Sequence, residues 1–208
     1  FLLPLMILFG AIGGAFWASI PALLKTKFNT NEILTSLMLT YVALFILDYF
    51  VVGPWKDPAG YGLPKSMPFP DAGRLPVLFD GLRIHIGVYF AIIICFITHI
   101  VYNKTLFGFK LRVSGLSSKA SQYAGFKYKN LIFYTFIISG ACAGLAGLFE
   151  VSGPIGLLYR DISPNYGFTA IIVAFLGRLN PLGIILSSLL IALTLSLIHI
   201  SEPTRHTR

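Results

Sequence analysis

Four polar residues stand where the sequence changes between apolar and polar segments, and their types suit binding or guiding a solute. Glu32 precedes one apolar run and Glu150 ends another. An acid in the bilayer core is usually functional, whereas one at the interface is solvated, and both interpretations apply to Glu150. Arg178 and Asn180 occupy a short polar break, where they either position a solute or cap a broken helix. We treat these four residues as a candidate translocation path.

Signatures of catalysis do not occur in the sequence, which contains no G-x-x-x-x-G-K-S/T, H-E-x-x-H or G-x-S-x-G pattern. His85 and His99 lie near the two ends of one apolar run, where they serve either a proton relay or, as we favour, helix packing. Cys95 and Cys142 fall inside apolar runs and are interpreted as small buried hydrophobes. We therefore expect a protein that is not an enzyme and that has no metal or cofactor of its own.

A basic stretch between Asn103 and Asn130 contains no acid and separates two apolar runs, Ile84–Tyr102 and Leu131–Val151. Both runs are long enough to cross a bilayer. Short loops rich in Lys and Arg stay in the cytoplasm, so this stretch is expected to face inward. Small residues in its middle also make it a candidate docking surface for a soluble partner. Its cations are Lys104, Lys110, Arg112, Lys119, Lys127 and Lys129.

The composition indicates an integral membrane protein. Hydrophobic residues make up 56% of the 208 residues and charged residues only 12%, whereas soluble domains contain about 25% charged residues. The net charge of +8 is explained by membrane orientation and does not indicate nucleic-acid binding. We expect an all-α fold, a polytopic transmembrane helical bundle in contact with membrane lipid.

Two further spans are expected before the basic stretch, at Phe1–Leu24 and Ile33–Val52, with Asn29 as the cap of the second. Asp48, near the end of the second span, is expected to be solvated. Gly53–Arg83 is rich in Pro and Gly and carries charges of both signs, so it is expected to form a long outer loop.

The last apolar region, Gly167–Thr194, is interrupted at Arg178–Pro181. It is either one span broken near Pro181 or a half-helix that turns back before a full span. Broken helices at membrane depth are tolerated where they are buried in protein or line an aqueous path. This region is therefore the sequence's best pointer to a transport pathway.

Both ends of the chain look unnatural at the level of sequence. The chain begins inside an apolar run, so we expect the natural N-terminus to be missing. Residues 195–208 resemble the translation of a transposase sequencing adapter, and we expect the transmembrane domain to comprise residues 1–194.

Several segments resemble the permease subunits of bacterial ABC importers of the branched-chain amino-acid and simple-sugar permease superfamily, and in particular its nucleoside-type branch. The resemblance covers about Phe1–Thr194. The run Ser139–Gly147, which is rich in Gly and Ala, is weak alone and equally typical of close helix packing. The segments that resemble the family are Asn31–Ile33, Leu37–Leu39, Gly53–Pro58, Gly108–Gly115, Lys119–Ala120, Ala124–Gly125, Ser139–Gly147 and Gly167–Gly183.

The resemblance implies a multi-pass subunit of the bacterial plasma membrane that pairs with a second permease subunit. It further implies a cytoplasmic ATP-binding subunit, which hydrolyses the ATP, and an extracytoplasmic substrate-binding lipoprotein. The coupling helix of the family corresponds to about Ser117–Gly125. The implied ATPase-coupling residues are Arg112, Gly115, Ser117, Lys119, Ala120, Tyr123, Ala124 and Gly125.

The sequence thus predicts a permease subunit that forms the path for nucleosides in an ATP-driven importer. A sugar or branched-chain amino-acid permease remains an alternative within the superfamily. A secondary transporter or channel, which needs no ATPase, is the alternative from another class.

Overall fold

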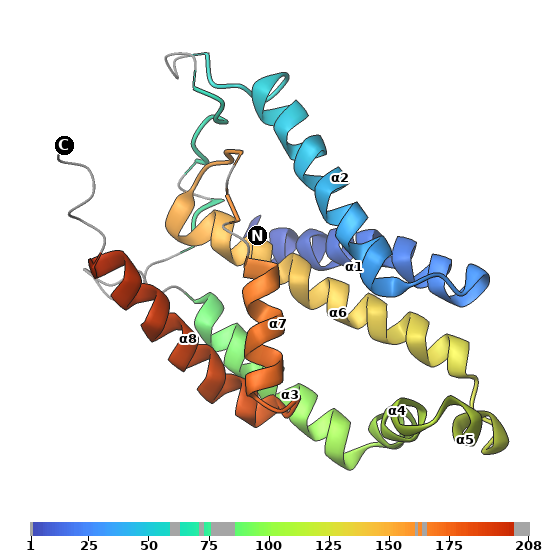
Figure 1. The fold of residues 1–208 in the computed structure, drawn as a ribbon. Helices are drawn as coiled ribbons and strands as arrows, with labels where there is room; N and C mark the ends of the chain where they lie inside the picture. Colours follow the sequence, from blue (N-terminus) through green and yellow to red (C-terminus); the bar gives the residue numbers. More distant parts are fainter. Residues whose placement is uncertain are drawn as a thin grey trace. The chain divides into compact units, whose positions relative to one another are not determined.

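The computed structural model describes residues 2–58, 63–70, 73–75, 86–160, 162–163 and 166–201. Helices account for most of this part of the chain (Figure 1). The predictions for His85, for the start of the third span at Ile84 and for residues 202–208 fall outside it. The elements are α1 (Leu2–Phe28), α2 (Glu32–Val52), α3 (Gly87–Lys104), α4 (Leu106–Leu116), α5 (Ser118–Tyr123), α6 (Tyr128–Glu150), the π-helical turn η2 (Val151–Ile155), α7 (Tyr166–Leu176) and α8 (Pro181–Ser201).

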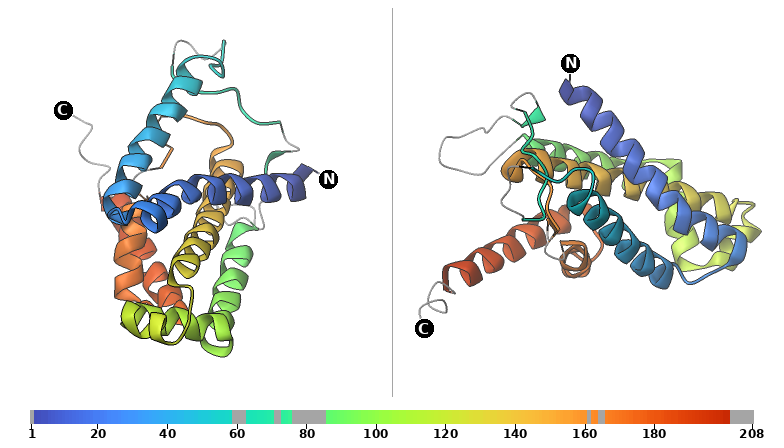
Figure 2. Two further views of the ribbon diagram at one scale, coloured as in Figure 1. Left: turned by 90° about the vertical axis from the view of Figure 1, so that its right-hand side faces the viewer. Right: turned by 90° about the horizontal axis from the view of Figure 1, so that it is seen from above.

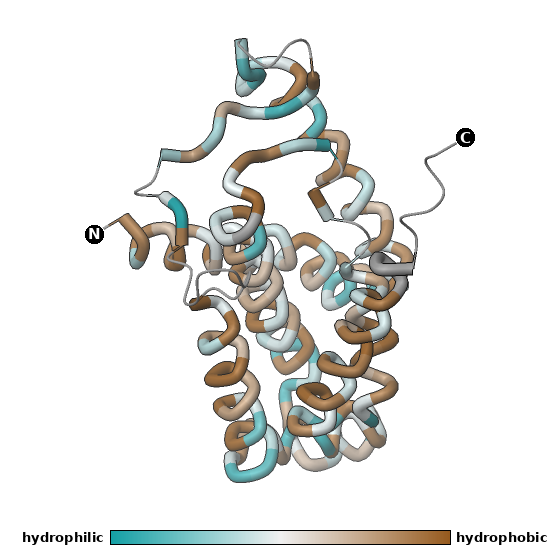
Figure 3. The backbone as a smooth tube through the Cα atoms, turned by 90° about the vertical axis from the view of Figure 1, so that its left-hand side faces the viewer, coloured by the Kyte–Doolittle hydropathy of each residue, from teal (hydrophilic) through white to brown (hydrophobic). Residues whose placement is uncertain are grey.

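Four of the described helices, α1, α2, α3 and α6, are long and apolar enough to cross a membrane. Hydrophobic residues run along their lengths, and hydrophilic ones gather in the connecting segments (Figure 3). Large apolar side chains on these helices point outward; Phe16 and Phe45, for example, are 69% and 68% exposed. Such surfaces suit lipid rather than water. The predicted all-α polytopic membrane fold is confirmed.

Two compact units make up the chain. The first comprises Phe1–Val88 and Lys110–Ile162, and the second comprises Tyr89–Phe109 and Ser163–Arg208. The first contains α1, α2, α5, α6 and most of α4, and the second contains most of α3 together with α7 and α8.

The crossing of α1 and α6 is the largest helix contact of the first unit (Figures 1 and 2). Three glycines allow it. A Cβ atom added at Gly14 would collide with the carbonyl oxygen of Gly140 and lie 2.8 Å from the Cα of Gly144. The two backbones touch directly, which is the close approach that small residues permit between helices in lipid.

The turn between α1 and α2 corrects the predicted cap. Asn31, not Asn29, caps α2: its side-chain Oδ1 accepts hydrogen bonds from the backbone N–H groups of Ile33 (3.0 Å) and Leu34 (3.5 Å). Asn29 has a left-handed φ of 52° and donates its N–H to the carbonyl of Lys25, which ends α1. Asn29 thus ends α1 and Asn31 starts α2. The sequence spacing alone does not show which of the two asparagines is the cap.

The described part of the predicted outer loop folds over the end of α6. The Ser66 N–H donates to the Leu158 carbonyl (2.8 Å), and the Leu158 N–H donates to the Ser66 hydroxyl (2.9 Å). The Phe69 N–H donates to the carbonyl of Gly156, which has a φ of 70°. These bonds attach the loop to the segment that follows η2.

The predicted basic loop is largely helical in the structure, because α4 and α5 occupy most of residues 103–130. Only Thr105 separates α3 from α4, and its hydroxyl accepts a hydrogen bond from the N–H of Gly108 at 3.2 Å. Apolar residues lie among Lys110 and Arg112 along α4 and do not gather on one face. Because cations dominate this stretch, its sequence predicts a loop rather than a helix.

In the second unit, α7 and α8 form a helical hairpin, so the half-helix that turns back is the alternative found. The Ser187 hydroxyl of α8 donates to the carbonyl of Val173 in α7 at 2.9 Å. A Cβ atom at Gly177 would lie 2.7 Å from the backbone nitrogen of Ile184, so the two helices touch at the turn. With 11 residues, α7 reaches only about half of a bilayer.

Candidate functional site

The segment expected to contact an ATPase begins with a capped short helix. The Ser117 side chain caps α5 by accepting a hydrogen bond from the N–H of Ala120 at 3.2 Å. At the other end, the N–H of Ala124 donates to the carbonyl of Ala120 (3.0 Å) and Gly125 takes a left-handed φ of 75°. Ser117 and Gly125 therefore act as start and stop signals for this helix.

Side-chain contacts hold α5 against α4. The hydroxyls of Ser114 and Ser121 are 2.9 Å apart, and Ser121 is fully buried. The Lys110 ammonium lies 5.5 Å from the centre of the Phe126 ring, within the range of a cation–π contact. The segment that comprises α4, α5 and the residues up to Phe126 is thus folded and has a defined outer face, and we call this segment the cap.

The outer face of this cap is apolar and aromatic at its most exposed points. Tyr123 is 92% exposed and Leu116 is 89% exposed. Lys119 and Ala120 are exposed as well, as are Arg112, Gly115, Ala124 and Gly125. The structure thus presents the predicted coupling residues on one short stretch of surface.

A pocket of about 270 Å³ lies beneath the cap, between α4, the start of α6 and the α1–α2 turn. Its polar side includes the ion pair of Lys25 and Glu32, whose Nζ and Oε2 atoms are 2.7 Å apart. Gly115 of α4 lines the same pocket. Glu32, predicted as part of a translocation path, therefore lies next to the predicted coupling segment.

The two acids at the outer ends of helices differ in their surroundings. Glu150 is the last residue of α6, is half-buried, and precedes the π-helical turn. Asp48, expected to be solvated, lies 3.6 Å from the Arg160 guanidinium and is partly buried. Its Oδ1 atom has no hydrogen-bond donor at bonding distance among the described residues, so the contact is electrostatic.

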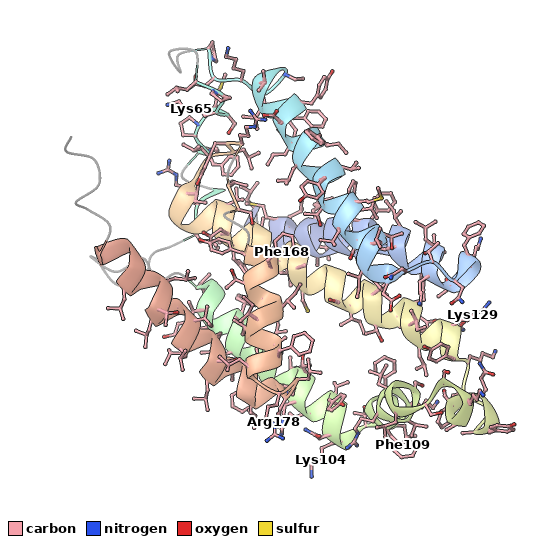
Figure 4. The ribbon with its side chains drawn as sticks, in the orientation of Figure 1. Lys65, Lys104, Phe109, Lys129, Phe168 and Arg178 are labelled. Atoms are coloured by element: carbon pink, nitrogen blue, oxygen red, sulfur yellow. The ribbon has the colours of Figure 1, made fainter. Side chains whose placement is uncertain are left out.

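Arg178 lies at the tip of the α7–α8 hairpin (Figure 4), and Asn180 lies in the same turn, directly before α8. Asn180 caps α8, since its Oδ1 accepts from the Leu182 N–H at 3.3 Å and its carbonyl accepts from the Ile184 N–H. Arg178 is exposed and has a left-handed φ of 53°. Helix capping therefore explains Asn180. The Arg178 side chain caps no helix in the described part of the chain.

The depth of this tip follows from α3. The Cys95 thiol donates to the carbonyl of Pro181 at 2.9 Å. Cys95 lies roughly 14 Å along α3 from Lys104 at the basic inner end, which is about half of a ~30 Å hydrocarbon core. The tip therefore packs against the middle of α3, a helix long enough to span a membrane. The sequence indicates only that Cys95 is a small buried hydrophobe. Its contact with the Pro181 carbonyl could not be predicted from the sequence.

A second pocket, of about 420 Å³, opens between α1, α2 and α6. Trp17 and Phe136 form aromatic parts of its wall, and Ser36, Thr40 and Ser139 contribute hydroxyls. Ser139 begins the Ser139–Gly147 run, but the other four residues carry no sequence signal, because they come from three helices and share no motif.

Comparison with known proteins identifies relatives over nearly the whole chain. A profile for the permease component of branched-chain amino acid transport systems matches residues 1–202. The glucose ABC transporter permease protein TsgB13 of Haloferax volcanii is 38% identical over 202 residues, covering 92% of this chain and 53% of that protein. The guanosine ABC transporter permease protein NupP of Bacillus subtilis is 33% identical over 196 residues, covering 91% and 55%.

A third relative, the nucleoside ABC transporter permease protein NupB of Lactococcus lactis, is 30% identical over 197 residues, which cover 91% of this chain and 54% of that protein. The chain spans about half the length of the curated relatives it matches. No solved structure matches the chain.

Proposed function

This chain belongs to the family of permease components of branched-chain amino acid transport systems, and we propose that it forms part of the membrane path of an ATP-driven importer. The observation that carries the proposal is the family match over residues 1–202, together with similarity to permeases of ABC transporters. Such a subunit works in the plasma membrane with a second permease subunit, a cytoplasmic ATP-binding subunit and an extracytoplasmic substrate-binding lipoprotein. The ATP-binding subunit hydrolyses the ATP.

We propose nucleosides as the imported solute. Two of the relatives described above are named for guanosine or nucleoside transport, and segments such as Gly53–Pro58 and Gly167–Gly183 resemble the nucleoside branch. Sugars are the second candidate, because the glucose permease of Haloferax volcanii shares 38% identity with this chain.

Contact with the ATP-binding subunit is assigned in this proposal to α5 and its flanks. The cap exposes Tyr123 and Leu116 almost completely and covers the pocket that holds the Lys25–Glu32 pair. A displacement of the cap would therefore change the shape of this pocket, next to the α1–α2 turn. Arg178, exposed at a tip that packs against the middle of α3, supports a role for the hairpin tip in the path, because a cation there needs protein or water around it.

Uptake measurements test the substrate. The importer containing this chain is reconstituted with its ATP-binding subunit and lipoprotein in vesicles, and uptake of labelled guanosine, uridine, glucose and leucine is compared. ATP-dependent uptake of nucleosides alone is the expected result. Uptake of glucose alone would assign the chain to the sugar class, and uptake independent of ATP would refute the importer.

Docking is tested with Ala120→Trp, which places a large side chain on the exposed face of α5, and with Ala120→Ser as the matched control. Forcing a large side chain into a packed contact costs about 1–3 kcal/mol, which corresponds to at least about a fivefold loss in docking. ATP hydrolysis stimulated by the loaded lipoprotein should fall in the Trp variant and persist in the Ser variant. Normal stimulation in both variants would show that the cap is only a connection between spans.

A further inference from the structure

The pocket between α1, α2 and α6 has the size and lining of a solute site. We propose that it binds an uncharged, hydroxylated solute, with Trp17 stacking on a flat face of that solute. This inference rests on the proposed function, for which the solute is a nucleoside. It assigns that solute a site of about 420 Å³, whose lining shares Phe136 with the pocket beneath the cap.

Glycines at the helix crossing create the space. Gly14, Gly140 and Gly144 all line the pocket and also form the contact between α1 and α6. Cβ atoms at these positions would meet the facing helix rather than the open part of the pocket. The helix backbones therefore form the wall of the pocket at the crossing, and the absence of side chains from that wall leaves room for a ring system.

The polar groups of the lining suit a solute that both donates and accepts hydrogen bonds. The Ser36 hydroxyl donates to the carbonyl of Ile33 (3.0 Å), and the Thr40 hydroxyl donates to the carbonyl of Ser36 (2.9 Å). Both oxygens keep lone pairs that accept from solute hydroxyls. Trp17 supplies an indole N–H donor, and Ser139 adds a hydroxyl of either role.

Charge selects the class of solute. None of the residues that line the pocket is ionisable at neutral pH. An amino acid carries both a carboxylate and an ammonium group, and burying either without a charged partner is expensive. A nucleoside or a sugar needs no such partner. The lining therefore disfavours a branched-chain amino acid, the solute for which the family is described.

Aromatic groups select among neutral solutes. Trp17 and Phe136 both line the cavity, and a flat base stacks well on an aromatic ring. A sugar offers only the weaker face of its ring carbons. The pocket opens against the first half of α2, where Ser36 lies about 6 Å along the helix from Glu32, and against the middle of α6, where its lining runs from Phe136 to Gly144. A solute held here is therefore bound within the length of these helices.

Protection from alkylation tests the site without relying on transport. Ser139→Cys is made in the assembled importer with Cys95 and Cys142 replaced by Ala, and reaction with N-ethylmaleimide is timed in the presence of guanosine, uridine, glucose or leucine. At ten times the dissociation constant, a bound nucleoside should slow alkylation about tenfold. Ser188→Cys, on the exposed surface of α8, is the matched control and should react at an unchanged rate.

The nucleoside concentration that gives half-maximal protection is the second measurement. Trp17→Ala should raise the nucleoside concentration that gives half-maximal protection by about tenfold, as expected for the loss of one stacking partner. Trp17→Phe should retain most of the protection, and Phe16→Ala, which removes the exposed neighbouring aromatic, should leave it unchanged.

The outcomes separate this site from the proposed function. Nucleoside uptake by the wild type without protection at position 139 overturns the site and leaves the importer intact. Protection by leucine overturns the uncharged solute, and equal protection at position 188 overturns a local site. Protection by glucose but not by nucleosides keeps the neutral site and refutes the nucleoside assignment.

Discussion

The crossing of α1 and α6 makes opposite predictions for two neighbouring glycines. Gly14→Ala adds a methyl group that collides with the Gly140 carbonyl oxygen and lies 2.8 Å from the Gly144 Cα, whereas Gly13→Ala meets no atom within 4 Å. Both substitutions improve helix propensity by about 1 kcal/mol. The difference between them therefore isolates the cost of overpacking.

The size of that cost follows from the distances. Ordinary contact begins near 3.4 Å, so α1 and α6 must separate by at least about 0.6 Å at the Gly144 Cα and by more at the Gly140 carbonyl oxygen, which lies closer to the added methyl group. A gap of about 0.5–1 Å loses a quarter to a half of each contact's dispersion energy. Overpacking of this kind costs about 1–3 kcal/mol. Gly13→Ala should raise the free energy of unfolding by about 0.5–1 kcal/mol. The free energy of unfolding of Gly14→Ala should be lower than that of Gly13→Ala by the overpacking cost.

Thermal unfolding of the purified chain in detergent measures both variants. Gly144→Ala provides a repeat of the test from the other helix, because its Cβ would collide with the Gly10 carbonyl oxygen, and Gly147→Ala, with no atom within 4 Å, is its control. Equal stability of Gly13→Ala and Gly14→Ala would refute the direct backbone contact between α1 and α6.

Three further predictions concern other parts of the chain. Ser117→Ala removes the cap of α5 and should cost about 1 kcal/mol of helix stability, seen as faster amide exchange in α5 with the four long helices unchanged. Leu179→Gly should raise the free energy of unfolding by about 0.5–1 kcal/mol, because a left-handed Leu with a φ of 55° is strained. Leu179→Val should lower the free energy of unfolding. If thermal unfolding gives the reverse order of stability, the left-handed conformation of Leu179 is refuted. For topology, a cysteine at Ser118 should react with an impermeant thiol reagent only in opened cells, and one at Met67 should react in intact cells; labelling at 118 alone in intact cells would invert the orientation.

Much of the fold was predictable because its signals are contiguous in sequence. Long apolar runs of about 20 residues have few alternatives to membrane helices, and α2 and α6 begin within three residues of their predicted starts. The polar break at Arg178–Pro181 also marked a real structural element. The choice between a broken span and a hairpin needed the contact of Ser187 with Val173, which joins residues 14 apart and leaves no motif.

The site was predictable only in part, for the same physical reason. The small residues around Ala120 could be assigned to a short helix by resemblance, but its attachment through Ser114 and Ser121 depends on how two helices fold together. The Lys25–Glu32 pair similarly joins a helix end to a helix start. The basic stretch was expected to be a loop because its charges dominate the composition, and α4 shows that a helix can carry such charges.

The hairpin of α7 and α8 has a consequence for how the protein enters the membrane. At 11 residues, α7 is too short to be retained in a bilayer as an independent span. Only when α8 has been synthesised can Ser187 reach Val173 and the two glycines close the turn. The hairpin must therefore insert as one piece, after its second helix has left the ribosome.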